Sequence, residues 1–207
     1  MIIGIASLTP QVGKTTAANY LIEKHDFAIT EMGDAVTYVS TKYFGFSGNK
    51  LDPSQRLILQ KIGKAGKEID KTIWLYYALW LIGVSKNKLG LGNPKTHTED
   101  NIYEHMTFKT MDRFRNKIKK EGFSKLYHSN YPQNIIVSGV RSPSEANGIL
   151  ELGGKVWLIT NNRVENKEVH AVENELFGYD RFSEVIENND SFENFYSKID
   201  EIMINNL

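Results

Sequence analysis

The most constraining feature of this chain is the tetrapeptide Gly-Lys-Thr-Thr at 13–16, which follows a short apolar run at 2–6. The run is typical of a strand buried on both faces, and the residues after the tetrapeptide have helical spacing. At such a junction the loop N–H groups and the positive end of the helix dipole favour a bound anion. The sequence therefore predicts a phosphate-binding loop, in which Lys14 reaches the β- and γ-phosphates of a nucleotide and Thr15 ligates Mg²⁺.

The loop departs from the usual Gly-x-x-x-x-Gly-Lys-Ser/Thr pattern at its first position, where this chain has Leu8. We expect the segment 7–12 to be a stiffer variant of the loop. The alternative is a chance Gly-Lys-Thr in an ordinary strand-to-helix turn, but the strand before it and the helix behind it favour phosphate binding. The residues expected to bind the nucleotide cofactor are Val12, Gly13, Lys14, Thr15 and Thr16.

Strand-like and helix-like patterns alternate along the rest of the chain. Further strands are expected at 27–30, 135–137, 156–159 and 184–186. Helices are expected at 16–24, 35–44, 71–85 and 102–118, and behind the start signals Asp52-Pro53, Ser142-Pro143 and Asp190. This alternation predicts an α/β fold, with a five-stranded parallel sheet covered by helices on both sides in three layers.

Composition limits the class of protein. The chain has 207 residues, 41% hydrophobic and 24% charged, which favours one folded α/β domain with insertions. Cysteine is absent, which excludes disulfides, thiolate catalysis and cysteine-ligated metal. Lys+Arg and Asp+Glu are both 25, so overall charge gives no sign of nucleic-acid binding.

The hydrophobic pattern gives no sign of a membrane protein. The longest strongly apolar run, 73–84, is well short of the ~20 residues needed to span a bilayer. No basic segment precedes the first strand, so no secretory signal is visible. We therefore expect a cytoplasmic protein.

Four other polar residues are candidates for a site. Asp34 and Arg141 follow expected strands, at the sheet edge where open α/β folds bind ligands. Asp34 is equally suited to capping the next helix. For Arg141 the alternative is a surface ion pair, but its place favours a phosphate contact. Arg56 on a helix and Arg163 in a polar loop could each contact a phosphate or remain solvated. The aromatic cluster Trp74, Tyr76, Tyr77 and Trp80 is more typical of a core than of a base-stacking surface.

The order and spacing of several sequence blocks resemble the deoxynucleoside monophosphate kinases of bacteriophages, which are P-loop nucleoside monophosphate kinases. The blocks are Met1-Ile2-Ile3-Gly4 with 13–16, Gly33-Asp34-Ala35, 56–63 through 66–70 to Ile73-Trp74, 140–146, 152–156, 170–176 and 185–189. They cover about three quarters of the chain.

The resemblance implies a three-layer P-loop NTPase fold of the nucleoside monophosphate kinase type with a helical insertion. It implies one kinase domain at 1–207, with monophosphate-binding helices at 45–85, the insertion at 86–132 and a lid at 161–172. Lys14, Arg141 and Arg163 would be catalytic. The residues implied around the monophosphate are Asp34, Arg56, Gln60, Trp74 and Arg141. The implied ligands are ATP, Mg²⁺ and a deoxynucleoside monophosphate, with no nucleic acid or membrane as partner. A homodimer stays open, and a phage-encoded protein would lie in the host cytoplasm.

Three features depart from that family. Gly139 stands where members commonly carry Asp, which removes a carboxylate that could organise Mg²⁺ or water. Val172 stands where Ser is frequent. The segment 85–132 has no recognised counterpart.

The expected activity is transfer of the ATP γ-phosphoryl group to the 5′-phosphate of a deoxynucleoside monophosphate. Such an acceptor is already anionic, so positioning and charge neutralisation suffice without a strong base. Two alternatives remain. One is a P-loop ATPase switch of the partition type, which would have a further lysine early in its loop. The other is a non-catalytic nucleotide-binding protein derived from a kinase, in which Leu8 and Gly139 mark lost activity.

Overall fold

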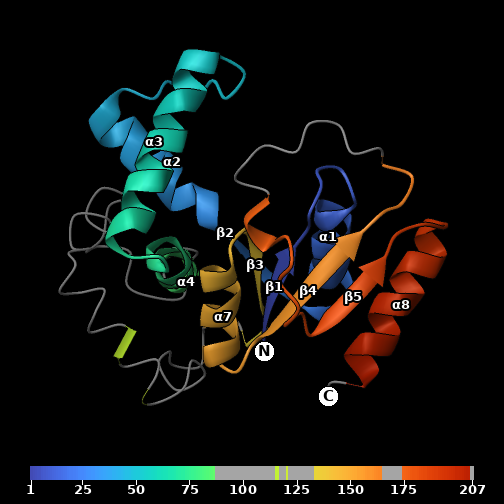
Figure 1. The fold of residues 1–207 in the computed structure, drawn as a ribbon. Coiled ribbons are helices and arrows are strands. Elements are labelled where there is room, and N and C mark those ends of the chain that lie inside the picture. Colours follow the sequence, from blue (N-terminus) through green and yellow to red (C-terminus); the bar gives the residue numbers. More distant parts are fainter. Residues whose placement is uncertain (87–114, 117–119, 121–132, 165–173, 206–207) are drawn as a thin grey trace. The chain divides into compact units, whose positions relative to one another are not determined.

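The structure, a computed structural model, describes residues 1–86, 115–116, 120, 133–164 and 174–205 (Figure 1). The helix expected at 102–118 lies almost wholly outside the described residues, as does most of the lid expected at 161–172. The chain forms two compact units, and each is described by itself. Unit 1 comprises Met1–Ile29 and Asn134–Leu207, and unit 2 comprises Thr30–Gln133. The single domain expected over 1–207 stays a prediction.

A five-stranded parallel sheet in the order β2-β3-β1-β4-β5 confirms the predicted fold class. Its strands are β1 (Ile2–Ala6), β2 (Ala28–Glu31), β3 (Ile135–Val140), β4 (Lys155–Thr160) and β5 (Glu184–Glu187). The first strand occupies the central position, between β3 and β4. All of its residues are buried, as the apolar run predicts. The loop that follows β1 therefore starts from the most firmly held strand of the sheet.

Three helices cover the two faces of the sheet in unit 1: α1 (Lys14–His25), α7 (Pro143–Glu151) and α8 (Phe192–Ile204). Helix α7 lies in front of the sheet in Figure 1, and α1 lies behind it. Ile3 and Ile5 join the core with α1 and α8. The alternate residue Gly4 faces α7, where a Cβ would come within 2.5 Å of Ile149 Cδ1. Glycine at this position lets α7 pack closely on the central strand.

Of the start signals at Asp52-Pro53, Ser142-Pro143 and Asp190, only the last is displaced, by one residue. The capping box at Ser142 and Glu145 is present, with Pro143 in the first turn of α7. Helix α8, however, is capped by Ser191, whose hydroxyl accepts a hydrogen bond from Asn194 N at 3.3 Å. The predicted cap, Asp190, lies one residue outside. Ser and Asp serve equally well as caps, so adjacent candidates cannot be separated by residue type.

Unit 2 contains α2 (Met32–Phe44), α3 (Pro53–Ile69) and α4 (Ile73–Lys86), which pack on one another. Asp52 caps α3, as predicted, by accepting a hydrogen bond from Ser54 N at 2.8 Å. Three of the four clustered aromatic residues of α4, Trp74, Tyr76 and Tyr77, are buried, which confirms the core interpretation for them, whereas Trp80 is partly exposed. These three helices, the described part of unit 2 up to residue 86, thus share an apolar interior.

Asp70, at the junction between α3 and α4, is held by several donors. Its carboxylate accepts hydrogen bonds from Thr72 N at 2.9 Å, from Thr72 Oγ1 at 3.0 Å and from the Arg115 guanidinium. The same guanidinium lies over the ring of Tyr76, 4.5 Å from its centroid. Burial alone would raise the pKa of Asp70, but the hydrogen bonds from Arg115 and Thr72 outweigh it and lower the pKa below 3.8.

A short 3₁₀ turn, η3 (Asn174–Leu176), precedes β5. Among the helices that the structure describes, none combines the length and apolarity that crossing a bilayer demands.

Candidate functional site

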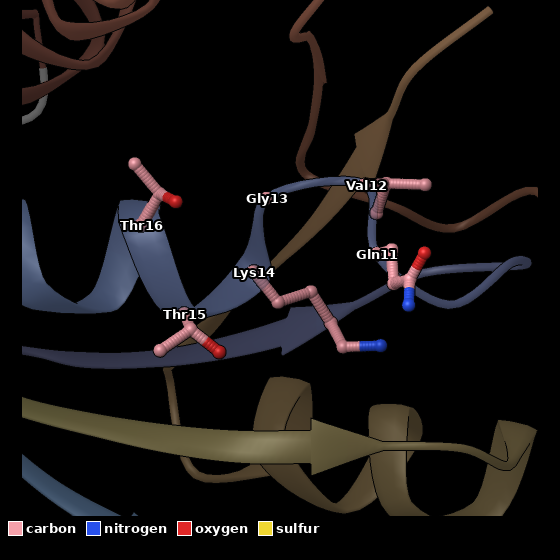
Figure 2. Close-up of a pocket in the computed structure, with 6 residues that line it drawn as sticks. All are labelled: Gln11, Val12, Gly13, Lys14, Thr15 and Thr16. Atoms are coloured by element: carbon pink, nitrogen blue, oxygen red, sulfur yellow. The ribbon is translucent and has the colours of Figure 1, made fainter. Parts of the chain in front are cut away.

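The loop between β1 and α1 forms a cavity of about 240 Å³, lined by the residues 11–16 (Figure 2). Two loop residues have left-handed backbone conformations, Gln11 with φ 62° and Gly13 with φ 108°. Leu8, the departure from the usual pattern, is not among the residues with positive φ. The tight turn is thus made further along the loop, at Gln11 and Gly13, so Leu8 causes no backbone strain of this kind.

The first turn of α1 supplies the electrostatics of this cavity. The N-cap Gly13 has no side chain, and the first turn contains no acidic residue. The first N–H groups of a helix have no partner within the helix, and the helix dipole places partial positive charge there. The cavity wall at 14–16 therefore suits a phosphate group, as the sequence predicts.

Lys14 and Thr15 extend from the same side of the loop in Figure 2, whereas Thr16 projects from the other side. Lys14 Nζ donates a hydrogen bond to the hydroxyl of Ser7, a buried residue just after β1. The Thr15 side chain is exposed in the cavity wall. Magnesium bound with nucleotide phosphates takes oxygen ligands and keeps several waters, so a single exposed hydroxyl at this place fits the ion.

Arg141 directly follows β3 and has an exposed side chain. Its backbone N–H donates to Glu145 Oε2 at 2.9 Å, and the N–H of Ser142 donates to the same oxygen at 3.1 Å. This buried carboxylate fixes the backbone from which Arg141 projects. No ion pair of the Arg141 guanidinium is found among the described residues, which leaves the surface ion-pair alternative without support there.

Gly139 forms a bulge near the end of β3. The pairing of β1 with β3 passes from Ile5↔Ser138 to Ala6↔Val140, so Gly139 has no partner in the register. Its φ is 77°, and a Cβ at this place would meet no atom within 4 Å. The departure from Asp therefore coincides with a left-handed backbone that most L-residues adopt only with strain.

The loop after β5 contacts both the first loop and the loop after β4. Asn188 Nδ2 donates to the Val12 carbonyl at 2.9 Å, and Asn188 N donates to the Thr160 carbonyl at 2.8 Å. Asn162 N donates to Asn189 Oδ1 at 2.8 Å. Arg163 lies in the β4 loop with an exposed side chain, and its N–H donates to Asn161 Oδ1 at 2.9 Å.

Unit 2 contains the other predicted substrate residues. Arg56 and Gln60 are exposed and lie one turn apart on α3, so they share a face. Asp34 lies in the first turn of α2, and Glu31 occupies the N-cap position without a capping hydrogen bond from its side chain. Partial burial and then the nearby charge of Glu31 raise the pKa of Asp34, although Lys50 opposes this. The alternative role of Asp34 as the N-cap is therefore wrong.

Trp74 is a core residue. It is 7% exposed, and its indole Nε1 donates to the Gly63 carbonyl at 2.9 Å. A Cβ added to Gly66 would lie 2.3 Å from Trp74 Cζ2. The indole thus occupies space on α3 that glycine leaves open, and its one donor is already engaged.

The structure brings Lys14, Thr15 and the rest of the loop together at one cavity, and their roles in binding stay a prediction. It also shows one contact of this loop that sequence reasoning missed, from Asn188. The partners of that contact, Asn188 and Val12, are 176 positions apart. The sequence signal nearest to it is the Asn-Asn pair after the last strand, which carried part of the resemblance but no role.

Comparisons with known proteins bear on the resemblance. No family model matches the chain. It is similar to a protein of Acanthamoeba polyphaga mimivirus described as "Putative deoxynucleotide monophosphate kinase", with 27% identity over 191 residues, covering 90% of this chain and 88% of that protein. A solved structure, dephospho-CoA kinase from Campylobacter jejuni, matches with a TM-score of 0.40 and 12% identity over 99% of this chain and 96% of that one. The viral relative confirms the resemblance to deoxynucleotide monophosphate kinases.

Proposed function

We propose that this chain is a deoxynucleoside monophosphate kinase, which transfers the γ-phosphoryl group of ATP to a deoxynucleoside monophosphate and releases ADP. The observation that carries the proposal is the cavity at 11–16, formed where the central strand meets the N-terminus of α1 and provided with Lys14 and Thr15. The similarity to the mimivirus protein, which extends over 90% of the chain, supports the choice of acceptor.

The proposed mechanism relies on positioning and on charge neutralisation. Loop N–H groups and the N-terminus of α1 hold the β- and γ-phosphates, and Lys14 exchanges its contact with Ser7 for a phosphate oxygen. Thr15 would hold Mg²⁺ in part, and the ion would supply further positive charge to the phosphates when bound. Arg141 and Arg163, exposed on loops of unit 1, neutralise charge on the transferred group.

Unit 2 supplies the acceptor side in this proposal. Arg56 and Gln60, on one face of α3, are donors suited to the oxygens of a monophosphate. Asp34 would accept a hydrogen bond from the acceptor nucleotide. Trp74 acts indirectly, because its packing against Gly66 holds α3 and α4 together.

The test is coupled ADP release with MgATP and each common deoxynucleoside and ribonucleoside monophosphate. We expect turnover with one or two deoxynucleoside monophosphates, and its loss in Lys14→Ala. Arg56→Ala should raise KM for the monophosphate by roughly tenfold or more and leave KM for ATP unchanged, because a charge-assisted hydrogen bond contributes about 1.5–3 kcal/mol. Lys61→Ala, which alters an exposed cation on the same helix, is the matched control.

The same assay separates the alternatives. ATP binding without turnover on any monophosphate would contradict the proposal and favour a non-catalytic nucleotide-binding protein. ATP hydrolysis stimulated by DNA would favour a partition-type switch.

A further inference from the structure

We propose that Asn188 is a positioning residue for the phosphate loop, holding the Val12 carbonyl in place so that the neighbouring N–H groups remain available to phosphate. This inference rests on the proposed function, since it concerns how the same cavity binds ATP. Asn188 does not itself line the cavity at 11–16. It would act on bound phosphate only through the loop.

The contact is well defined at both ends. Asn188 Nδ2 donates to the Val12 carbonyl at 2.9 Å, and its backbone N–H donates to the Thr160 carbonyl at 2.8 Å. The residue follows β5 directly, so its backbone is tied to the ends of two neighbouring strands of the sheet. The side chain is half-buried. The backbone of Asn188 is therefore held by the sheet, and its side chain can keep the Val12 carbonyl in place.

Gly13 shows that the loop and Asn188 fit closely. A Cβ at Gly13 would lie 2.4 Å from Asn188 Nδ2, so the Asn188 amide would have to shift from its present place, and the φ of 108° already favours glycine. The glycine of the Gly-Lys-Thr motif thus has a second requirement beyond its backbone angle. It leaves space for the amide of Asn188.

The loop needs such support because part of its conformation is strained. Gln11 has a φ of 62°, a conformation that costs an L-residue about 1–2 kcal/mol. A loop that relaxed from this state when empty would have to be ordered again on binding, which lowers affinity. The amide of Asn188 also gives the Val12 carbonyl oxygen a hydrogen-bond donor within the protein.

The choice of ligand separates two roles of Asn188, support of the loop and direct contact with the base of ATP. Inorganic tripolyphosphate has the phosphates of ATP but neither base nor sugar. If Asn188 acts through the loop, loss of its amide weakens tripolyphosphate and ATP by the same factor. A residue that contacts the base would affect ATP alone.

The experiment is calorimetric titration of the full chain with MgATP and with magnesium tripolyphosphate. For Asn188→Ala we expect both dissociation constants to rise about threefold to tenfold, the range for loss of one hydrogen bond. Asn188→Asp retains the size of the side chain but places a carboxylate against the Val12 carbonyl, so a larger loss is expected. In the kinase assay, KM for ATP should rise while kcat at saturating ATP stays within about twofold.

Asn147→Ala is the matched control. Asn147 Oδ1 accepts hydrogen bonds from Tyr179 and Arg181 in unit 1, and Asn147 does not line the cavity at 11–16. We expect it to lower the melting temperature without changing either affinity. Folding of every variant is checked by its melting curve, and Asn188→Asp serves if Asn188→Ala fails to fold.

Several results would overturn the inference. These are unchanged affinities in Asn188→Ala and Asn188→Asp, a loss confined to ATP, or a wild-type protein that binds neither ligand. A wild type that binds both ligands but transfers no phosphoryl group contradicts the proposed function alone. The inference about Asn188 is then decided by the two variants.

Discussion

Lys14 and Asp70 are two charged residues whose side chains are held by hydrogen bonds within the protein. Lys14 donates to Ser7, and Asp70 accepts from Arg115. The two pairs differ in whether they persist during the proposed reaction. Lys14 has to leave Ser7 to reach a phosphate, whereas the proposed reaction assigns no role to Asp70 and leaves its hydrogen bonds in place. The pair at Asp70 is therefore a contribution to stability.

Asp70→Asn should lower the free energy of unfolding by about 1.5–3 kcal/mol at pH 7, the range for hydrogen bonds to a charged group. The pKa of Asp70 is lowered in the folded state, so its contribution is fully present above the unfolded value of 3.8. It is lost as pH falls through the lower, folded pKa. Urea unfolding at pH 7, 4 and 3 should show the difference between variant and wild type shrinking at pH 3.

The control for this comparison is Glu68→Gln, which removes an exposed carboxylate whose pair with Lys64, at 3.9 Å, lies on the surface of α3. It should change stability by less than about 0.5 kcal/mol at pH 7. A difference for Asp70→Asn that is as large at pH 3 as at pH 7 would show that its carboxylate charge is irrelevant.

The packing of α3 against α4 depends on the close approach of Trp74 to two glycines. The indole of Trp74 on α4 occupies the space above Gly66 on α3 and donates to the carbonyl of Gly63, one turn earlier. Both glycines lie within a helix, where glycine is otherwise unfavourable. Only Gly66 is required by its surroundings.

Gly66→Ala should therefore destabilise the protein by about 1–2 kcal/mol. Its Cβ would overlap the indole of Trp74, and the cost of this overlap exceeds the gain in helix propensity from alanine. Gly63→Ala is the matched variant on the same helix. Its Cβ would lie 3.8 Å from Val36, an ordinary contact, and it should stabilise by about 0.5–1 kcal/mol. Urea unfolding measures both, and equal effects would mean that the packing of α3 on Trp74 is loose.

The sequence identified elements well because their signals are local. The apolar runs, Asp52-Pro53 and the Ser142 to Glu145 capping box each lie within a few residues, and each predicted the element that the structure shows. The requirement for Gly66 could not be found in this way. It depends on an indole in another helix, and a glycine within a helical pattern does not reveal what approaches it.

At the scale of the whole molecule, the candidate residues belong to two units. The phosphate loop, Arg141 and Arg163 lie in unit 1, and the expected acceptor residues lie in unit 2. The loop was predictable because all its residues are contiguous and follow the first strand. Its contact with Asn188 was not, since the order of strands that brings β5 near the loop is a property of the folded sheet.

Nucleotide binding should be visible in the stability of the whole chain. MgATP at about 100 times its dissociation constant should stabilise the folded state by about 2.7 kcal/mol, since a ligand that binds only the folded protein shifts the equilibrium by mass action. Thermal melting with and without MgATP measures this. Lys14→Ala should show a much smaller shift at the same concentration, and an equal shift would place the ATP site elsewhere.

The position of β1 has a consequence for the order in which the chain is made. Both neighbours of this strand, β3 and β4, belong to the segment Asn134–Leu207, whereas unit 2 is one continuous stretch. During synthesis the apolar residues of β1 leave the ribosome long before β3 and β4, the two strands that pair with β1. Unit 2 can become compact first, and the phosphate loop acquires its shape only when the final third of the chain has emerged.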